Sequence, residues 1–208
     1  MFNYICDPKQ IYQNSFDMVL QLTEFGDMRK LDRDIAIRLI HACGMPSIIE
    51  NLRFSLGAVE SGHLALKNSA RIFVDSEMVA AGIIKKKLIY RNTVTCTLNE
   101  PAVAAEAEER GMTRSAVAVE LWDQQLEGAI VVFGNAPTAL FRFLELLNNG
   151  GGKPALILAF PVGFVGALES KEALCKFSCG VPYITLLGRN GGSAIAAAAV
   201  NALTIGTL

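Results

Sequence analysis

The second half of the sequence repeats one unit three times, and this repeat constrains the fold more than any other feature. Each unit is an apolar run, then a loop rich in small residues, then a segment with helical character. The apolar runs lack polar alternation and helices separate them, which is typical of a parallel sheet covered on both faces. We therefore predict a three-layer α/β/α fold with a mainly parallel sheet. The expected strands are 129–133, 155–159 and 183–187, the loops 134–138, 161–166 and 188–192, and the helices 139–147, 167–177 and about 193–203.

The first part of the chain predicts a helical segment that precedes this sheet. Asp7 followed by Pro8 is a helix start, because an N-cap acceptor is followed by proline at the first helical position. That helix should run to about Phe25, and a second should begin at Asp32 and end at Gly44. Further elements are expected as a helix over 46–69, a short apolar run at 72–74, a strand over 93–98, a helix over 102–110 and a helix from 113 that carries Trp122.

Composition favours one compact domain over residues 1–208. The chain is 51% hydrophobic and 19% charged, which is typical of a globular protein. We interpret the three glycines at 150–152 as a loop within one unit. The net charge is −1, so nothing favours a nucleic-acid partner. The basic run 85–87 is expected to be a solvated edge.

The cysteines indicate reduced thiols and no metal site. The five cysteines form no CxxC pair, and no histidine lies near Cys175 and Cys179. We therefore expect a cytoplasmic protein without a bound metal. The longest apolar run, 193–208, is too short to span a bilayer, so no membrane partner is expected.

His41 is the first candidate for acid–base chemistry. The chain has two histidines, and histidine is the side chain whose ordinary pKa lies near neutral pH. Arg38 precedes His41 by three residues and shares its helix face. Ser15, from the first helix, can meet both if the two helices pack together. Taken alone, His41 is more typical of a structural histidine in a packed helix. We interpret the other histidine, His63, as a surface residue.

The loops of the three repeated units predict a binding edge for anions. In open parallel sheets the ligand site lies at the carboxyl ends of the strands. Each loop leads into a helix N-terminus, where free amides favour negative charge. Arg114 and Arg189 would add fixed positive charge. A ligand with several carboxylates or phosphates is therefore expected. A nucleotide is disfavoured, because the chain has neither GxxxxGK[ST] nor a GxGxxG after the first strand.

Eight short motifs in one order resemble the precorrin-8X methylmutase family over nearly the whole chain. The most specific are the Asn-Ala-Pro-Thr-Ala-Leu and Pro-Val-Gly-Phe-Val-Gly blocks. The motifs are Ile11-Tyr12-x-x-Ser15-Phe16, Arg38-x-x-His41-Ala42-Cys43-Gly44, Asp75-x-Glu77-Met78-Val79, Thr113-Arg114-Ser115-Ala116, Gly134-Asn135-Ala136-Pro137-Thr138-Ala139-Leu140, Pro161-Val162-Gly163-Phe164-Val165-Gly166-Ala167 with Glu169-Ser170-Lys171, Gly180-Val181-Pro182, and Gly188-Arg189-x-Gly191-Gly192-Ser193.

This resemblance implies an isomerase of cobalamin biosynthesis that moves a methyl group from carbon 11 to carbon 12 of a corrin precursor. It implies that His41 gives or takes a proton, that Ser15 and Arg38 contact the substrate, and that the enzyme is a homodimer with its site near the subunit interface. We expect Arg38 to bind a substrate carboxylate and the reaction to need no cofactor. The alternative is a tetrapyrrole-binding carrier without turnover. Further expected substrate-binding residues are Tyr12, Arg114, Asn135, Thr138 and Arg189.

Overall fold

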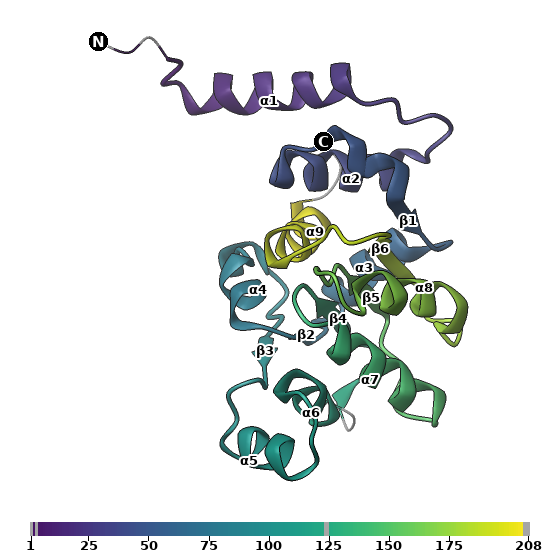
Figure 1. Ribbon diagram of the computed structural model, residues 1–208. Helices are drawn as coiled ribbons and strands as arrows, with labels where there is room; N and C mark the ends of the chain where they lie inside the picture. The colour runs from purple at the N-terminus through teal and green to yellow at the C-terminus, as the bar shows by residue number, and fades with distance from the viewer. Residues whose placement is uncertain (1, 3, 123–124, 206–208) are drawn as a thin grey trace.

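A single sheet lies at the centre of the computed structural model, which describes residues 2, 4–122 and 125–205 (Figure 1). In this part of the chain six strands are ordered β1-β6-β5-β4-β2-β3. All neighbouring pairs are parallel except β1 and β6, which are antiparallel. The predicted, mainly parallel sheet is therefore confirmed. The strands are β1 (Leu52–Phe54), β2 (Ile72–Val74), β3 (Val94–Cys96), β4 (Ile130–Phe133), β5 (Leu156–Ala159) and β6 (Tyr183–Leu186).

Helices cover both faces of the sheet, as the three-layer prediction requires. Side chains of β4 alternate between the two cores: Ile130 and Val132 belong to one, and Val131 and Phe133 belong to the other. The first core is closed by α2 (Lys30–Cys43), α3 (Ala58–Lys67), α4 (Glu77–Gly82) and α9 (Ser193–Ile205). The second is closed by α7 (Pro137–Asn148), α8 (Ala167–Phe177) and the end of α6 (Arg114–Glu120), against which α5 (Pro101–Glu109) packs.

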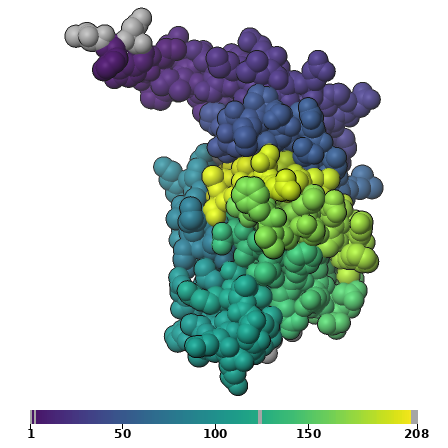
Figure 2. Space-filling view, viewed as in Figure 1, coloured from purple at the N-terminus to yellow at the C-terminus, as the bar shows by residue number. Residues whose placement is uncertain are grey.

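Helix α1 (Pro8–Leu22) lies outside the three layers and packs mainly on α2 (Figures 1 and 2). Its start is as predicted, because the Asp7 side chain accepts a hydrogen bond from the amide of Lys9 at 3.0 Å. It ends three residues before the predicted Phe25. Its buried residues are Phe16 and Val19. Ile11, Met18 and Leu22 form an exposed apolar stripe along one side of this helix, and Leu20 is exposed on its other flank.

The helix predicted over 46–69 is wrong in its first half. A short 3₁₀ helix, η1 (Pro46–Asn51), leads into β1, and α3 begins only at Ala58. β1 is an edge strand of three residues whose pairing partners lie in β6, and Leu52 stands opposite Leu186. Such a strand forms because a distant segment supplies its hydrogen bonds, so local helical pattern could not reveal it. Helix α2 begins at Lys30, two residues before the predicted Asp32.

The remaining elements agree with the sequence, except that α6 ends at Glu120, so Trp122 lies in the turn after this helix and not in it. The run at 72–74 is a buried parallel strand, and the strand predicted over 93–98 is present as β3. The basic run forms the short 3₁₀ helix η2 (Lys85–Lys87), whose three side chains are exposed as predicted. Among the described helices, none combines the length and the apolarity that a membrane crossing requires.

Candidate active site

His41 lies in the last turn of α2, where the helix ends in an exposed position. Gly44 adopts the left-handed conformation, with φ of 68°, and donates its amide to the Ile40 carbonyl at 2.8 Å, which closes the helix. The imidazole stacks on Phe16 of α1, with ring centroids 5.1 Å apart, and meets the edge of Tyr12 at 6.4 Å. Two aromatic rings from α1 therefore orient the imidazole, while its residue stays open to solvent.

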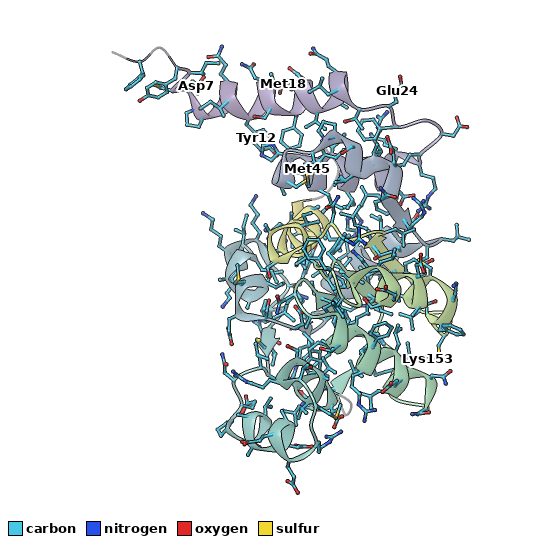
Figure 3. The ribbon with its side chains drawn as sticks, viewed as in Figure 1. Asp7, Tyr12, Met18, Glu24, Met45 and Lys153 are labelled. Carbon is cyan, nitrogen blue, oxygen red and sulfur yellow. The ribbon has the colours of Figure 1, made fainter. Side chains whose placement is uncertain are left out.

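Arg38 lies beneath these rings, one turn earlier on α2. Its residue is 8% exposed, and its Nη1 donates a hydrogen bond to the Tyr12 hydroxyl at 2.9 Å. The guanidinium carbon lies 5.6 Å from the centroid of the Phe16 ring, within cation–π range. The Nε atom is buried and has no hydrogen-bond partner in the described part of the chain. Arg38 thus fixes Tyr12 beside His41. Figure 3 shows Tyr12 on the side of α1 that faces α2.

Ser15 lies on the same helix as these rings but engages its own backbone. Its residue is half-buried, and its hydroxyl donates to the Ile11 carbonyl at 2.7 Å. The oxygen can still accept a hydrogen bond from a ligand. The structure therefore brings Tyr12, Arg38 and His41 together, whereas the residue predicted to meet Arg38 and His41 was Ser15, whose hydroxyl contacts its own helix.

Helix α2 runs antiparallel to α9, and this orientation places His41, at the end of α2, at the carboxyl edge of the sheet. The two helices pack along their length, and Leu31 at the start of α2 shares a cavity with Leu203 at the end of α9. The end of α2 therefore lies near the start of α9 at Ser193. That start follows β6, so His41 belongs to the same edge as the strand-to-helix loops.

The loop after β4 is held by Asp75, a residue that is 3% exposed. Its carboxylate accepts three backbone hydrogen bonds, from the amides of Gly134 (2.9 Å), Asn135 (2.9 Å) and Ala136 (2.8 Å). Burial raises the pKa of Asp75 above its usual range, against the opposite effect of these three donors. This contact fixes the backbone at the start of α7 and leaves Asn135 exposed.

Arg114 and Thr138 lie together but apart from His41. The Thr138 hydroxyl is 2.7 Å from the Thr113 hydroxyl. Arg114 donates from Nη2 to the Leu98 carbonyl at 3.0 Å and to the Asn99 side chain at 2.8 Å. Both residues are exposed. Arg114 begins α6, and Figure 1 shows α6 and α1 at opposite ends of the molecule. One chain therefore does not gather all the predicted site residues around His41.

Arg189 borders a cavity between the loops that follow β5 and β6. The cavity has a volume of about 520 Å³ and is lined by Val162, Gly163, Phe164, Leu168, Gly188, Arg189 and Asn190. The guanidinium carbon of Arg189 lies 6.0 Å from the centroid of the Phe164 ring. Beside this cavity Lys171 is fully buried, although the sequence pattern gave no sign of it.

His63 is not the surface residue that we predicted. It is half-buried on α3, its Nε2 atom is buried without a hydrogen-bond partner among the described residues, and burial lowers its pKa. It lines a cavity of about 360 Å³ together with Leu31 and Leu203, at the end of α2 opposite to His41. Its burial comes from segments far away in the sequence. In residues 2, 4–122 and 125–205 no cluster of three potential metal ligands occurs.

The fold and this edge define an α/β enzyme that is suited to acid–base chemistry on a ligand with several negative charges. An exposed imidazole, Arg189 on the loop after β6, and the N-termini of helices lie at or near the carboxyl ends of the strands.

Comparison with known proteins identifies the family. The family profile "Precorrin-8X methylmutase" matches residues 10–205. A precorrin-8X methylmutase of Pseudomonas aeruginosa is 53% identical, over 98% of each chain. A cobalt-precorrin-8 methylmutase of Salmonella typhimurium is 38% identical, over 97% of this chain and 96% of the relative. The crystal structure of a precorrin-8X methylmutase from Thermus thermophilus has a TM-score of 0.86 at 39% identity, with 95% of each chain covered. This chain belongs to the precorrin-8X methylmutase family, isomerases of cobalamin biosynthesis.

Proposed function

We propose that His41 transfers the proton that drives methyl migration from carbon 11 to carbon 12 of a precorrin-8X-type macrocycle. The observation that carries this proposal is the imidazole at the carboxyl edge, stacked on Phe16 beside Tyr12 and open to solvent. Proton donation to a ring nitrogen makes the conjugated system a better electron sink. The bond from carbon 11 to the methyl group then breaks while the bond to carbon 12 forms, and the proton returns to His41. Substrate and product have the same composition, so the reaction needs no redox cofactor.

Arg38 supports this chemistry through Tyr12. Its low exposure and its hydrogen bond to the Tyr12 hydroxyl favour a bracing role over the direct carboxylate contact that we expected. Ser15 is the nearby hydroxyl whose oxygen can accept a hydrogen bond from a peripheral group of the substrate. Asn135, Thr138, Arg114 and Arg189 remain predicted contacts for the carboxylates.

The test uses single turnover, followed by the change in the macrocycle's visible spectrum. His41→Ala and His41→Asn should bind substrate but convert it at least about 10²-fold more slowly, because neither side chain transfers a proton at neutral pH. His63→Gln is the matched control at the other histidine. Conversion at the wild-type rate by both His41 variants would reduce His41 to a structural residue. Binding without turnover by the wild-type protein would favour the carrier alternative.

The native metal state of the substrate can be settled in the same assay. The named relatives include methylmutases for both precorrin-8X and cobalt-precorrin-8. A metal held by the macrocycle needs no protein ligand, so side-by-side turnover of metal-free and cobalt-containing substrates is the direct comparison. We place the reaction in the cytoplasm, to which five free cysteines are suited.

We further propose that the enzyme is a homodimer whose sites combine both protomers. The exposed apolar face of α1 supports association, and the separation of α6 from α1 supports a site in which the Arg114 loop of one protomer meets His41 of the partner. Sedimentation should show the dimer at micromolar concentration. A stable monomer of about 22 kDa would contradict this proposal.

Complementation tests the shared site directly. His41→Ala and Arg114→Ala protomers are each expected to be impaired, and mixed dimers would contain one site with both wild-type residues. Mixing them, with exchange of subunits, should therefore restore activity. If the mixture stays as inactive as the two separate variants, His41 and Arg114 do not act across the interface.

A further inference from the structure

Lys171 on α8 is a buried cation whose hydrogen-bond partners are backbone carbonyls. Its residue is 0% exposed, and its Nζ donates to the Pro161 carbonyl at 3.0 Å and to the Asn190 carbonyl at 2.8 Å. No salt bridge to Lys171 occurs in the described part of the chain. Burial lowers its pKa to about 8. Burying an ammonium group is costly, so its retention points to a role in holding these two carbonyls.

The two carbonyls belong to different loops. Pro161 follows β5 and Asn190 follows β6, and both loops lie at the carboxyl edge. Two backbone hydrogen bonds also join them, from the amide of Gly192 to the Phe160 carbonyl at 2.8 Å and from the amide of Gly163 to the Arg189 carbonyl at 3.2 Å. The loops are thus in direct backbone contact, and the ammonium of Lys171 is the side-chain link between them.

The joined loops present an apolar surface beside a positive charge. Phe164 is 87% exposed and Val165 is 90% exposed, although both are large apolar side chains. Arg189 lies against the Phe164 ring, and both line the cavity of about 520 Å³. Gly163 and Gly166, with φ of 141° and 79°, flank this apolar pair. An apolar ring face with a carboxylate at its edge is the ligand chemistry that such a surface fits.

We propose that Lys171 is a positioning residue, whose ammonium joins the two loops and thereby fixes Phe164 and Arg189 for contact with the macrocycle and one of its carboxylates. Lys171 itself does not touch substrate, because its side chain is closed off from solvent. The identity of the ligand rests on the proposed function; the joining of the loops does not.

The test compares Lys171→Met with Lys176→Met. The first replaces the lysine by an unbranched apolar side chain that is one atom shorter and removes both hydrogen bonds, whereas Lys176 is an exposed lysine on the same helix. Amide hydrogen exchange of Gly163 and Gly192 should accelerate by about tenfold or more in Lys171→Met, which corresponds to about 1.4 kcal/mol. The KM for the macrocycle should rise about tenfold with kcat changed less than about threefold. Lys176→Met should match the wild type in both measurements.

Each alternative outcome bears on a separate statement. Wild-type exchange of Gly163 and Gly192 in folded Lys171→Met would overturn the link between the loops. Faster exchange with an unchanged KM would reduce Lys171 to a structural residue. If the wild-type protein converts no macrocycle, the proposed function fails, while the exchange result stands by itself.

Phe164→Ser provides a second test of the inference in case Lys171→Met does not fold. Phe164 is almost fully exposed, so its replacement should leave folding intact. The KM should rise here too, because the apolar contact is lost, and an unchanged KM would overturn the inference.

Discussion

Replacing Asp75 by alanine should cost a large part of the protein's stability. The carboxylate accepts three backbone hydrogen bonds of 2.8 to 2.9 Å, and alanine leaves all three donors without it. A buried donor without a partner costs about 1–3 kcal/mol. The Gly134 amide bears this cost in full, whereas the Asn135 and Ala136 contacts are only partly buried and water can replace them in part. We therefore expect a loss of about 3–6 kcal/mol in the free energy of unfolding.

Asp75→Asn should cost less than Asp75→Ala. The amide oxygen can take the place of Oδ2 and still accept from Asn135 and Ala136, but the NH₂ group then faces the N–H donor of Gly134. We expect a loss of about 1–3 kcal/mol in the free energy of unfolding, since two donors are satisfied and one is not. Against a total stability of about 5–15 kcal/mol, both changes are easily measured.

The assay is urea denaturation at pH 7, followed by far-ultraviolet circular dichroism. Glu77→Ala is the control, because Glu77 is an exposed acidic residue two positions away and should change stability by about 0.5 kcal/mol or less. If Asp75→Ala loses less than about 1 kcal/mol, the three hydrogen bonds do not hold the loop after β4, and the account of how Asn135 is positioned is wrong.

Three further predictions concern packing and charge. Gly191→Ala should destabilise the protein by about 1–3 kcal/mol, because a Cβ atom there would meet the Phe160 carbonyl and lie 2.7 Å from the Pro161 carbonyl. Thermal unfolding measures this loss of stability, and an unchanged midpoint would contradict the close approach of the loops. Trp122→Phe should cost about 1–3 kcal/mol in urea denaturation, because the buried indole donates to the Thr97 hydroxyl at 2.8 Å; a neutral substitution would mean that this hydrogen bond contributes nothing. The pKa of Lys171, about 8 in the folded protein against 10.5 ordinarily, means that the folded state releases this proton first as pH rises. The free energy of unfolding of the wild type should therefore rise by up to about 3 kcal/mol relative to that of Lys171→Met between pH 8 and 10.5. Parallel pH–stability curves for the two proteins would contradict this prediction.

The sequence predicted those features that depend on local pattern. The three strand–loop–helix units appear close to their predicted bounds, because a buried strand and a capped helix are visible in a few neighbouring residues. The sequence indicated that Ser15 would meet Arg38 and His41 if the first two helices pack together; the helices do pack, but Tyr12 makes the hydrogen bond to Arg38, and Ser15 bonds to its own backbone. The proposed proton transfer at His41 came from family resemblance, since the imidazole alone is more typical of a structural histidine.

Features that depend on contacts between distant segments could not be predicted from the sequence. β1 exists because β6 pairs with it, and His63 is half-buried because Leu31 and Leu203 lie beside it. Lys171 looks like a surface lysine among the charged residues of its helix, and only the three-dimensional arrangement shows that two loop carbonyls surround its ammonium. The separation of Arg114 from His41 is likewise a matter of tertiary structure.

The central position of α9 has a consequence for the order in which this protein can fold. Helices α2, α3 and α4 all pack against α9, and β1 needs β6 as its partner. These N-terminal elements leave the ribosome well before residues 183–205 do, so their apolar faces have no native surface to cover until synthesis is nearly finished. Pairings so distant in sequence make folding slow. We expect the layer that carries His41 to assemble only after α9 has emerged, and nascent chains to depend on chaperones until then.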